Sequence, residues 1–136
     1  MQGTVVALFV APDKISGSVP KHEVCALALG FEGDSRATKG ARQVLMVSQD
    51  VLREFDLSPG VLYENMVVDG LDVMRLQRGE QLRVGEAILE VTLPCDPCIR
   101  MERIRKGLKK ALDGKRGMFA KVITSGVIRV GDSVES

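Results

Sequence analysis

Short runs of β-branched and aliphatic residues recur along the whole chain and leave little room for long helices. Each run ends at glycine, proline or a polar cluster, as strands of an all-β domain do. Turns are predicted at Ser125-Gly126 and at Gly131-Asp132. Strands this short and evenly spaced favour a closed barrel or a sandwich. The predicted strands are residues 5–10, 23–29, 43–47, 63–68, 81–84, 87–93, 119–123 and 127–130.

Two segments have helical features instead. The first follows Ser48, a favourable N-cap residue, and stops before Pro59-Gly60. In the second, apolar residues recur three and four positions apart, which predicts one amphipathic helix that contains Gly107 and stops near Gly114. Its apolar positions are Met101, Ile104, Leu108 and Leu112.

Size and hydropathy predict one globular domain over residues 1–136. The chain has a mass of 14.8 kDa, and 45% of its residues are hydrophobic. No apolar run approaches the ~20 residues that a membrane helix needs. Residues 1–10 lack the basic start and cleavage site of a signal peptide. We therefore expect a cytoplasmic protein with no membrane association.

Two of the three cysteines, Cys95 and Cys98, flank Asp96-Pro97 just before the basic helical segment. A structural disulfide is disfavoured in a reducing compartment, so a close pair indicates metal, redox or nucleophilic chemistry. With Asp96 as N-cap and Pro97 at the first helical position, Cys98 lies in the first turn. The helix dipole and the nearby arginines would stabilise a thiolate there. The alternative is that these cysteines are small packing residues.

Structural zinc and thioredoxin-like redox chemistry both use Cys-x-x-Cys pairs, but the rest of the chain supports them poorly. Structural zinc requires four ligands, and the remaining soft candidates are His22 and Cys25. Three positions apart on a strand, these two side chains face opposite sides. We expect His22 to be exposed and Cys25 to belong to the core. A thioredoxin-like pair needs a βαβ framework, which the predicted elements lack.

Positive charge is concentrated after the cysteines although the net charge is only +1. This basic block is either a solvated surface or a surface for an anionic ligand or partner. One tyrosine, four phenylalanines and no tryptophan offer few stacking platforms, which argues against nucleic acid. The block contains Arg100, Arg103, Arg105, Lys106, Lys109, Lys110, Lys115, Arg116 and Lys121, against Glu102 and Asp113.

Two upstream segments are candidates for ligand contact. The glycine-rich loop at residues 29–42 carries Arg36, Lys39 and Arg42, a combination suited to phosphate or carboxylate. The alternative is a long hairpin connection. Glu64-Asn65 places polar side chains in an otherwise apolar strand, where they need partners or a ligand. The alternative there is an edge strand with ordinary alternation.

The ordered set of these motifs resembles the MOSC domain, named after the C-terminal domain of molybdenum cofactor sulfurases. The resemblance runs from about residue 5 to residue 134, and the chain is similar to small stand-alone members. The motifs are Gly-x-Glu-Gly-Asp at residues 30–34, Arg42-Gln43-Val44, Pro59-Gly60, Glu64-Asn65, Gly79, Gly85, Pro97-Cys98, Gly117, Gly126 and Gly131-Asp132.

The resemblance implies a mostly β (α+β) fold, a closed β-barrel of the MOSC or pyruvate kinase barrel-like type with a few short helices. It also implies that Cys98 carries sulfur as a persulfide or ligates molybdenum, as in reductases of N-hydroxylated compounds such as the mitochondrial amidoxime-reducing component. The cofactor would be the molybdenum cofactor (molybdopterin). The residues expected around it are Asp34, Arg36, Lys39, Arg42, Glu64, Asn65, Arg100 and Arg103.

One position departs from the family pattern. Arg36 stands where many relatives carry a histidine, so the loop has no acid/base side chain that titrates near pH 7. The first functional hypothesis is a protein that binds the molybdenum cofactor or a related anionic small molecule and, if it reduces a substrate, uses an external electron donor. The alternative is a non-catalytic module for sulfur transfer or partner binding, with Cys98 charged by a cysteine desulfurase.

Overall fold

The computed structural model is built mainly of β-strands and describes residues 1–37 and 40–136. Its helices are short, and within the described residues none is long and apolar enough to cross a membrane. The strands are β1 (Gln2–Val10), β2 (Val19–Lys21), β3 (Glu23–Leu27), β4 (Gly30–Phe31), β5 (Val44–Ser48), β6 (Met66–Asp69), β7 (Gln81–Val84), β8 (Ala87–Pro94), β9 (Met118–Thr124), β10 (Gly126–Arg129) and β11 (Ser133–Glu135). The helices are α1 (Gln49–Glu54), α2 (Arg100–Ile104) and α3 (Leu108–Ala111), with a 3₁₀ turn, η1 (Val73–Arg75).

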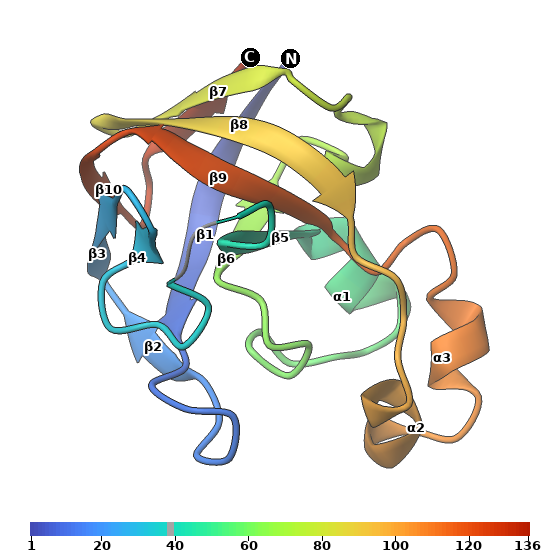
Figure 1. Ribbon diagram of the computed structural model, residues 1–136. Helices are drawn as coiled ribbons and strands as arrows, with labels where there is room; N and C mark the ends of the chain where they lie inside the picture. Colours follow the sequence, from blue (N-terminus) through green and yellow to red (C-terminus); the bar gives the residue numbers. More distant parts are fainter. Residues whose placement is uncertain (38–39) are drawn as a thin grey trace.

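Seven strands close into a barrel in the order β11-β7-β8-β9-β5-β6-β1, and β1 pairs with β11 to complete it. The two ends of the chain therefore lie side by side (Figure 1). Neighbouring strands of the barrel are antiparallel except β5 and β6, which are parallel. The closed β-barrel that the family resemblance implies, one of the two architectures that the strand spacing favours, is confirmed.

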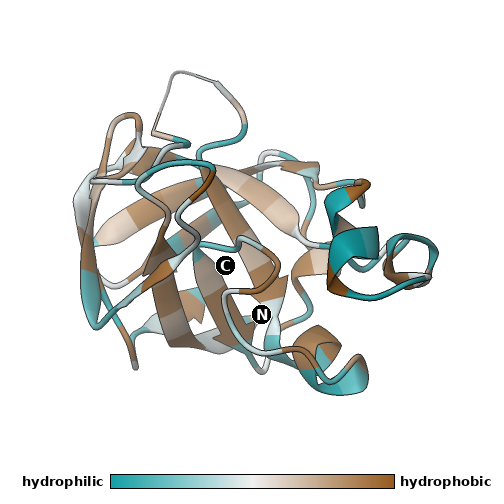
Figure 2. Ribbon diagram, turned by 90° about the horizontal axis from the view of Figure 1, so that it is seen from below, coloured by the Kyte–Doolittle hydropathy of each residue, from teal (hydrophilic) through white to brown (hydrophobic). Residues whose placement is uncertain are grey.

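Strand β5 joins the two cores of the molecule because both of its faces are buried. Val44 and Met46 belong to the cluster that fills the barrel, whereas Leu45 and Val47 belong to a second cluster outside it. Alternate residues of a strand face opposite sides, so helices must cover the outer face of β5. The outer cluster contains Leu52 of α1, Met101 of α2, Leu108 of α3, and Leu112, which directly follows α3. Figure 2 shows hydrophobic colour along the strands and mixed colour on the short helices beside them.

The first predicted helix is confirmed, with a refinement at its start. Ser48 is the N-cap residue of α1, but its side chain makes no capping bond. Instead its hydroxyl accepts a hydrogen bond from the Val73 N–H and donates one to the Leu71 carbonyl. The predicted position of Ser48 is therefore correct, while its hydroxyl fastens α1 to the segment around η1.

The prediction of one continuous helix after the cysteines is wrong. The chain forms α2 and α3, separated at Gly107, whose φ of 86° lies in the left-handed region. Both oxygens of the Glu102 carboxylate stabilise this break by accepting the N–H groups of Gly107 and Lys109, at 3.0 and 2.9 Å. The predicted apolar face persists across the break, because Met101, Leu108 and Leu112 are buried.

The predicted strands exist with shifted ends, and three strands were missed. The segment 63–68 becomes a strand only from Met66, so Glu64 and Asn65 precede β6. The missed strands β2, β4 and β11 are two or three residues long, too short to show alternation. The last of these is the strand that closes the barrel.

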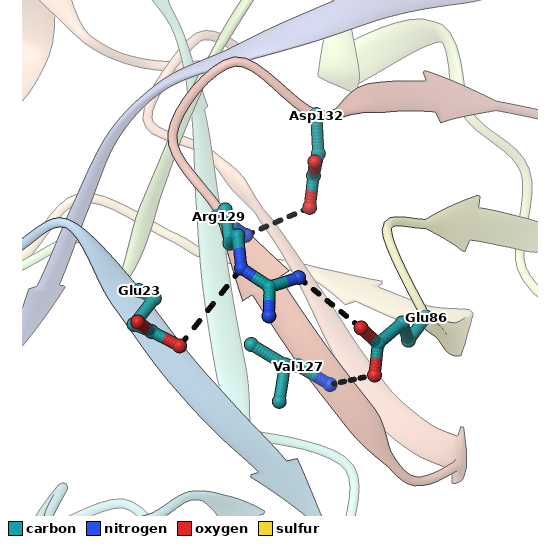
Figure 3. Close-up of polar contacts among 5 residues, drawn as sticks. All are labelled: Glu23, Glu86, Val127, Arg129 and Asp132. Carbon is teal, nitrogen blue, oxygen red and sulfur yellow. Dashed lines mark hydrogen bonds and ion pairs between the residues drawn. The ribbon is translucent and has the colours of Figure 1, made fainter.

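A small sheet, β10-β3-β4, lies on the side of the barrel away from α2 and α3 (Figure 1). Arg129 joins its strands to the β7–β8 turn. Its Nη1 is 3.1 Å from a Glu86 oxygen and its Nε is 4.0 Å from a Glu23 oxygen, while its backbone N–H donates to Asp132 at 2.7 Å (Figure 3). Glu86 also accepts the Val127 N–H at 3.5 Å. We call Arg129 with Glu23, Glu86 and Asp132 the carboxylate cluster.

Candidate functional site

Two adjoining hollows, of about 260 and 340 Å³, lie where β8 ends and α2 begins. They share Arg36, Tyr63, Cys98 and Arg100, and the second extends toward Ala11, Asp13, Lys14 and Ser35. We call the first the arginine pocket. It is lined by Arg36, Arg42, Tyr63, Pro94, Cys95, Asp96, Cys98, Arg100, Arg116 and Phe119.

A larger hollow of about 740 Å³ lies elsewhere, over β8 and β9. Its charged lining residues are Arg78, Glu90 and Lys121, and the last two form an ion pair of 3.4 Å. Its described lining contains neither a cysteine nor a predicted site residue. Chemistry, and not size, therefore identifies the arginine pocket as the candidate site.

The two cysteines of the pair differ in exposure. The backbone N–H of Cys95 donates to the Gly117 carbonyl at 2.9 Å, which extends the β8–β9 pairing, and its side chain is half-buried. The Cys98 side chain is exposed. At Cys95 the chain is still held against β9, and α2 begins only at Arg100. The predicted cap at Asp96 is wrong, since Ile99 is the N-cap residue and Cys98 precedes α2.

Burial raises the pKa of the Cys95 thiol, and the positive charges of Arg116 and Arg36 oppose this increase. The thiol contacts the carbonyl oxygen of Asp96 at 3.8 Å. All three cysteines of the chain are free thiols. Cys95 is thus an inner thiol that lies within the field of two guanidinium groups, and Cys98 is an outer one.

Arg116 is the most deeply buried cation of the pocket, with 4% of its surface exposed. Its Nη2 donates to the Leu62 carbonyl at 2.5 Å. Its Nε and Nη1 atoms have no hydrogen-bond partner among the residues that the structure describes. In the sequence Arg116 belongs to the basic block but is not marked as a site residue. Because arginine is a hydrophilic residue type, the sequence gave no indication that Arg116 is buried.

Arg36 and Arg100 hold Tyr63 from two sides. Arg36 Nη1 donates to the Tyr63 carbonyl at 2.6 Å, and its guanidinium carbon lies 5.8 Å from the centre of the Phe119 ring. The guanidinium carbon of Arg100 lies 4.9 Å from the centre of the Tyr63 ring. Tyr63 has a φ of 60°, which is uncommon for a residue other than glycine. Two cations therefore maintain an unusual backbone conformation at the pocket wall.

The arginines of the pocket lack carboxylate partners. Burial lowers the pKa of the Arg36 guanidinium, Asp34 opposes this, and Arg116 and Arg100 lower it further. Arg42 is exposed on the same wall. In the described part of the chain, no carboxylate oxygen lies within 4.0 Å of these four guanidinium groups. The pocket is an electropositive cavity beside two thiols.

Glu64 lies behind the pocket lining and organises the loop around it. Its carboxylate accepts the N–H groups of Gly60 and Leu62 at 2.8 and 3.1 Å. Burial raises the pKa of Glu64, and the Gly60 N–H and the charge of Arg116 act against that increase. Glu64 therefore fixes the segment whose carbonyl oxygens hold Arg116 and Arg36.

Asn65 and Asp34 likewise bond to the backbone. Asn65 Oδ1 accepts the Leu45 N–H at 2.9 Å and Arg36 Nη1 at 3.3 Å. Asp34 accepts the Ala11 N–H at 2.7 Å and the Arg36 N–H at 3.0 Å. Both residues bond to Arg36 as well as to the backbone of a neighbouring segment. They therefore contribute to the site indirectly, by holding Arg36.

The remaining predicted residues are divided. Arg36, Arg42, Arg100 and Cys98 come together in the pocket, whereas Arg103 is exposed and does not appear in its described lining. Lys39 lies outside the described residues. His22 is exposed and Cys25 is only half-buried on β3. In the described ranges, no three His, Cys, Asp or Glu residues gather as they would around a metal ion.

Comparison with known structures shows the same fold in several bacterial proteins. The YUAD protein of Bacillus subtilis is 21% identical, with a TM-score of 0.88 over 99% of this chain and 95% of that chain. YiiM of Escherichia coli is 23% identical, with a TM-score of 0.76 over 99% and 69%. YiiM of Geobacillus stearothermophilus is 21% identical, with a TM-score of 0.80 over 98% and 74%.

The sequence itself carries the family relationship. No curated protein matches the chain. The family model described as the MOSC domain matches residues 33–135, which include Arg36, both pocket cysteines and Arg116. That match covers most of the barrel and all of its covering helices, and the chain belongs to the MOSC domain family.

Proposed function

We propose that this protein binds the molybdenum cofactor, or a related anionic ligand, in the arginine pocket, and that Cys98 is a metal ligand or a persulfide carrier. The observation that supports this most strongly is the meeting of four arginines without carboxylate partners and two free thiols in one cavity. Membership of the MOSC family makes this ligand class the leading candidate.

The chemistry of the lining fits such a cofactor. Thiolates are soft ligands suited to sulfur-rich metal centres, and guanidinium groups bind phosphate with two donors at once. Arg116, which lines the cavity, has two nitrogens without a hydrogen-bond partner among the described residues. When bound, the cofactor would supply a redox-active metal centre. Cys98 would hold the metal, the arginines would hold anionic groups, and Tyr63 and Phe119 would exclude water. Electrons for an N-hydroxylated substrate would come from a separate donor.

The exposure of Cys98 supports sulfur transfer as a second candidate function. Its thiolate would attack the outer sulfur of a persulfide on a cysteine desulfurase. A bond forms between Cys98 Sγ and that sulfur, and the donor thiolate leaves with the electron pair of the broken bond. The exposed cations Lys106, Lys109 and Lys110 follow α2 and would attract an acidic donor surface.

One experiment tests both candidates. The wild type, Cys98→Ser and Cys95→Ser are expressed with a complete molybdenum cofactor pathway, and molybdenum content and intact mass are measured. Stoichiometric molybdenum that is lost in Cys98→Ser would support the cofactor site. A reducible mass gain of one sulfur that requires Cys98 would support the carrier. If the wild type carries neither, both candidates are wrong.

A further inference from the structure

The hollow of about 740 Å³ over β8 and β9 has no role in the proposed function. Its volume lies within the range of about 300 to 1,000 Å³ that small-molecule pockets occupy. Its floor is the paired strands β8 and β9, which run side by side across the barrel (Figure 1). It shares no described lining residue with the arginine pocket. This hollow, which we call the β8–β9 groove, is therefore a separate site.

Alternation along β8 and β9 decides which side chains reach the groove. Leu89 and Val122 belong to the barrel core, so the residues next to them in the sequence face outward. Glu90 and Lys121 lie opposite each other in the β8–β9 register and form an ion pair of 3.4 Å. Ile123 of β9 has 46% of its surface exposed and also lines the groove. The floor thus combines a neutralised charge pair with an apolar surface.

Two buried polar side chains hold two walls of the groove in place. The side-chain amide of Gln43 donates to the Ala28 carbonyl at 3.2 Å and accepts the Val122 N–H at 2.9 Å, which joins the turn that contains Ala28 to β9. The hydroxyl of Thr92 donates to the Ala41 carbonyl, which joins a second segment to β8. A wall that is already fixed loses little conformational entropy when a ligand arrives. These walls are therefore preorganised.

The third wall supplies an unpaired positive charge. The Gly79 N–H donates to the Val91 carbonyl at 2.8 Å, so the turn that carries Arg78 is held against β8. The Arg78 side chain is exposed and lines the groove. In the described part of the chain, no carboxylate oxygen lies within 4.0 Å of its guanidinium group. Because Lys121 is paired with Glu90, the groove is complementary to a ligand with one negative charge.

The apolar part of the lining is aliphatic. Leu29, on the wall next to Ala28, has 44% of its surface exposed, and Ile123 on the floor is similarly exposed. Single exposed apolar side chains are ordinary, but these two line the same hollow. The described lining contains no aromatic ring on which a planar ligand would stack. An aliphatic chain would instead release water from this surface.

We propose that the β8–β9 groove binds an aliphatic monocarboxylate of medium chain length. Arg78 holds the carboxylate, and the chain lies against Leu29 and Ile123. The single negative charge of the ligand matches the single unpaired cation of the lining, and its apolar chain matches the aliphatic walls. The site goes beyond the proposed function, because it requires neither Cys98 nor the arginine pocket.

Binding of octanoate, followed by NMR of isoleucine methyl groups, tests the proposal. Ile123 lies in the groove, whereas Ile99, which is 63% exposed, follows Cys98 and reports on the other site. We expect a saturable shift of the Ile123 methyl signals and none at Ile99. Acetate has the charge without the chain, and octylamine has the chain with the opposite charge. Each should bind at least about tenfold more weakly than octanoate.

Variants of exposed residues separate the two parts of the ligand. Arg78→Gln should weaken octanoate binding by about fivefold, because it removes charge-assisted hydrogen bonds to the carboxylate. Leu29→Ser should weaken it by about threefold, because it removes apolar surface. Arg83→Gln is the matched control: Arg83 is also exposed and without a carboxylate within 4.0 Å among the described residues, but it lies on β7 outside the groove lining. This variant should bind as the wild type does.

Three results would overturn the proposal. The first is a shift at Ile99 without one at Ile123, and the second is unchanged affinity in Arg78→Gln or equal affinity for octylamine. The third is occupation of the groove by a second copy of the chain, measured by light scattering over a range of protein concentrations. Self-association that Leu29→Ser abolishes, with no effect of octanoate on Ile123, would assign the groove to that second copy. The molybdenum and persulfide measurements depend on Cys98, so failure of this site and failure of the proposed function are distinguishable.

Discussion

Arginine occupies two opposite electrostatic situations in this barrel. In the carboxylate cluster, Arg129 lies among Glu23, Glu86 and Asp132, and its hydrogen bond to Glu86 raises its pKa (Figure 3). In the arginine pocket, burial lowers the pKa of Arg36, and Arg116 has two unpartnered nitrogens in the described structure. An arginine with carboxylate neighbours links strands together, whereas an arginine without them keeps its positive charge available for a ligand. The difference separates a structural region from a binding region.

The largest expected effect on stability comes from a substitution that disturbs the carboxylate cluster. A Cβ added at Gly126 would collide with the backbone carbonyl carbon and oxygen of Glu86, and backbone cannot move aside cheaply. We expect Gly126→Ala to lower the free energy of unfolding by about 3 kcal/mol, as overpacking in a close contact does. Urea unfolding measures the loss. Gly17→Ala, at a position with open space around it, should cost about 1 kcal/mol from its positive φ alone.

The next effect distinguishes the regions by their response to phosphate. Ligand that binds only the folded state at about 100 times its dissociation constant adds about 2.7 kcal/mol to the free energy of unfolding. Phosphate should therefore raise the urea midpoint of the wild type and of Arg129→Met, but not that of Arg116→Met. Equal shifts of the urea midpoint in Arg129→Met and Arg116→Met would show that the two arginines do not differ in their capacity to bind phosphate.

Glu64 supplies a smaller effect that depends on pH. Replacement with glutamine leaves one of the two N–H groups without its acceptor, so Glu64→Gln should lose about 1.5 kcal/mol. Below about pH 4.3, the ordinary pKa of glutamate, Glu64 is protonated in folded and unfolded protein alike. Because burial raises its pKa in the folded state, its contribution falls as the pH rises through the folded pKa.

Urea unfolding across acidic to neutral pH would measure this dependence. The difference in unfolding free energy between wild type and Glu64→Gln should be largest at low pH and shrink as the pH rises. A difference that grows with pH would contradict the assignment of burial as the dominant influence on Glu64.

The smallest effect is kinetic. Cys98 is exposed and Cys95 is half-buried with a raised pKa, so iodoacetamide should modify Cys98 first, by about tenfold in rate. Arg36→Gln should slow the reaction of Cys95 further, because a positive charge that favours its thiolate is removed. Arg129→Gln should leave both rates unchanged. Peptide mass spectrometry over time measures all of these rates.

Local sequence pattern predicted the strands well, because the alternation of residue types and the glycines that end a strand can both be recognised within a short segment. It failed where contacts between residues far apart in the sequence determine the local structure. The helix after the cysteines starts only at Arg100, and Cys95 before it is still paired with Gly117, a contact between segments far apart in the chain. Arg116 looks like any surface cation in the sequence, and only the packing of the loop that contains Leu62 buries it.

The site was predicted in the same uneven way. Residue type and order brought Cys98, Arg36, Arg42 and Arg100 into consideration, and the fold places them in one pocket. Glu64 and Asn65 were expected beside the ligand because buried polar groups need partners. Their partners turned out to be backbone groups and, for Asn65, also Arg36. Sequence shows that a buried polar group requires a partner, but not which partner it obtains.

The pairing of β1 with β11 has a consequence for how the protein folds. Gln2 lies opposite Glu135, so the last seam of the barrel joins residues 133 positions apart. Contacts of such long range form slowly, since the loop entropy is lost before the contact is gained. Of the barrel strands β11 is synthesised last, and until it pairs β1 exposes an unpaired edge. The interval before closure is when the chain is most open to aggregation, and substitutions in this three-residue strand should act on folding yield before they act on any ligand.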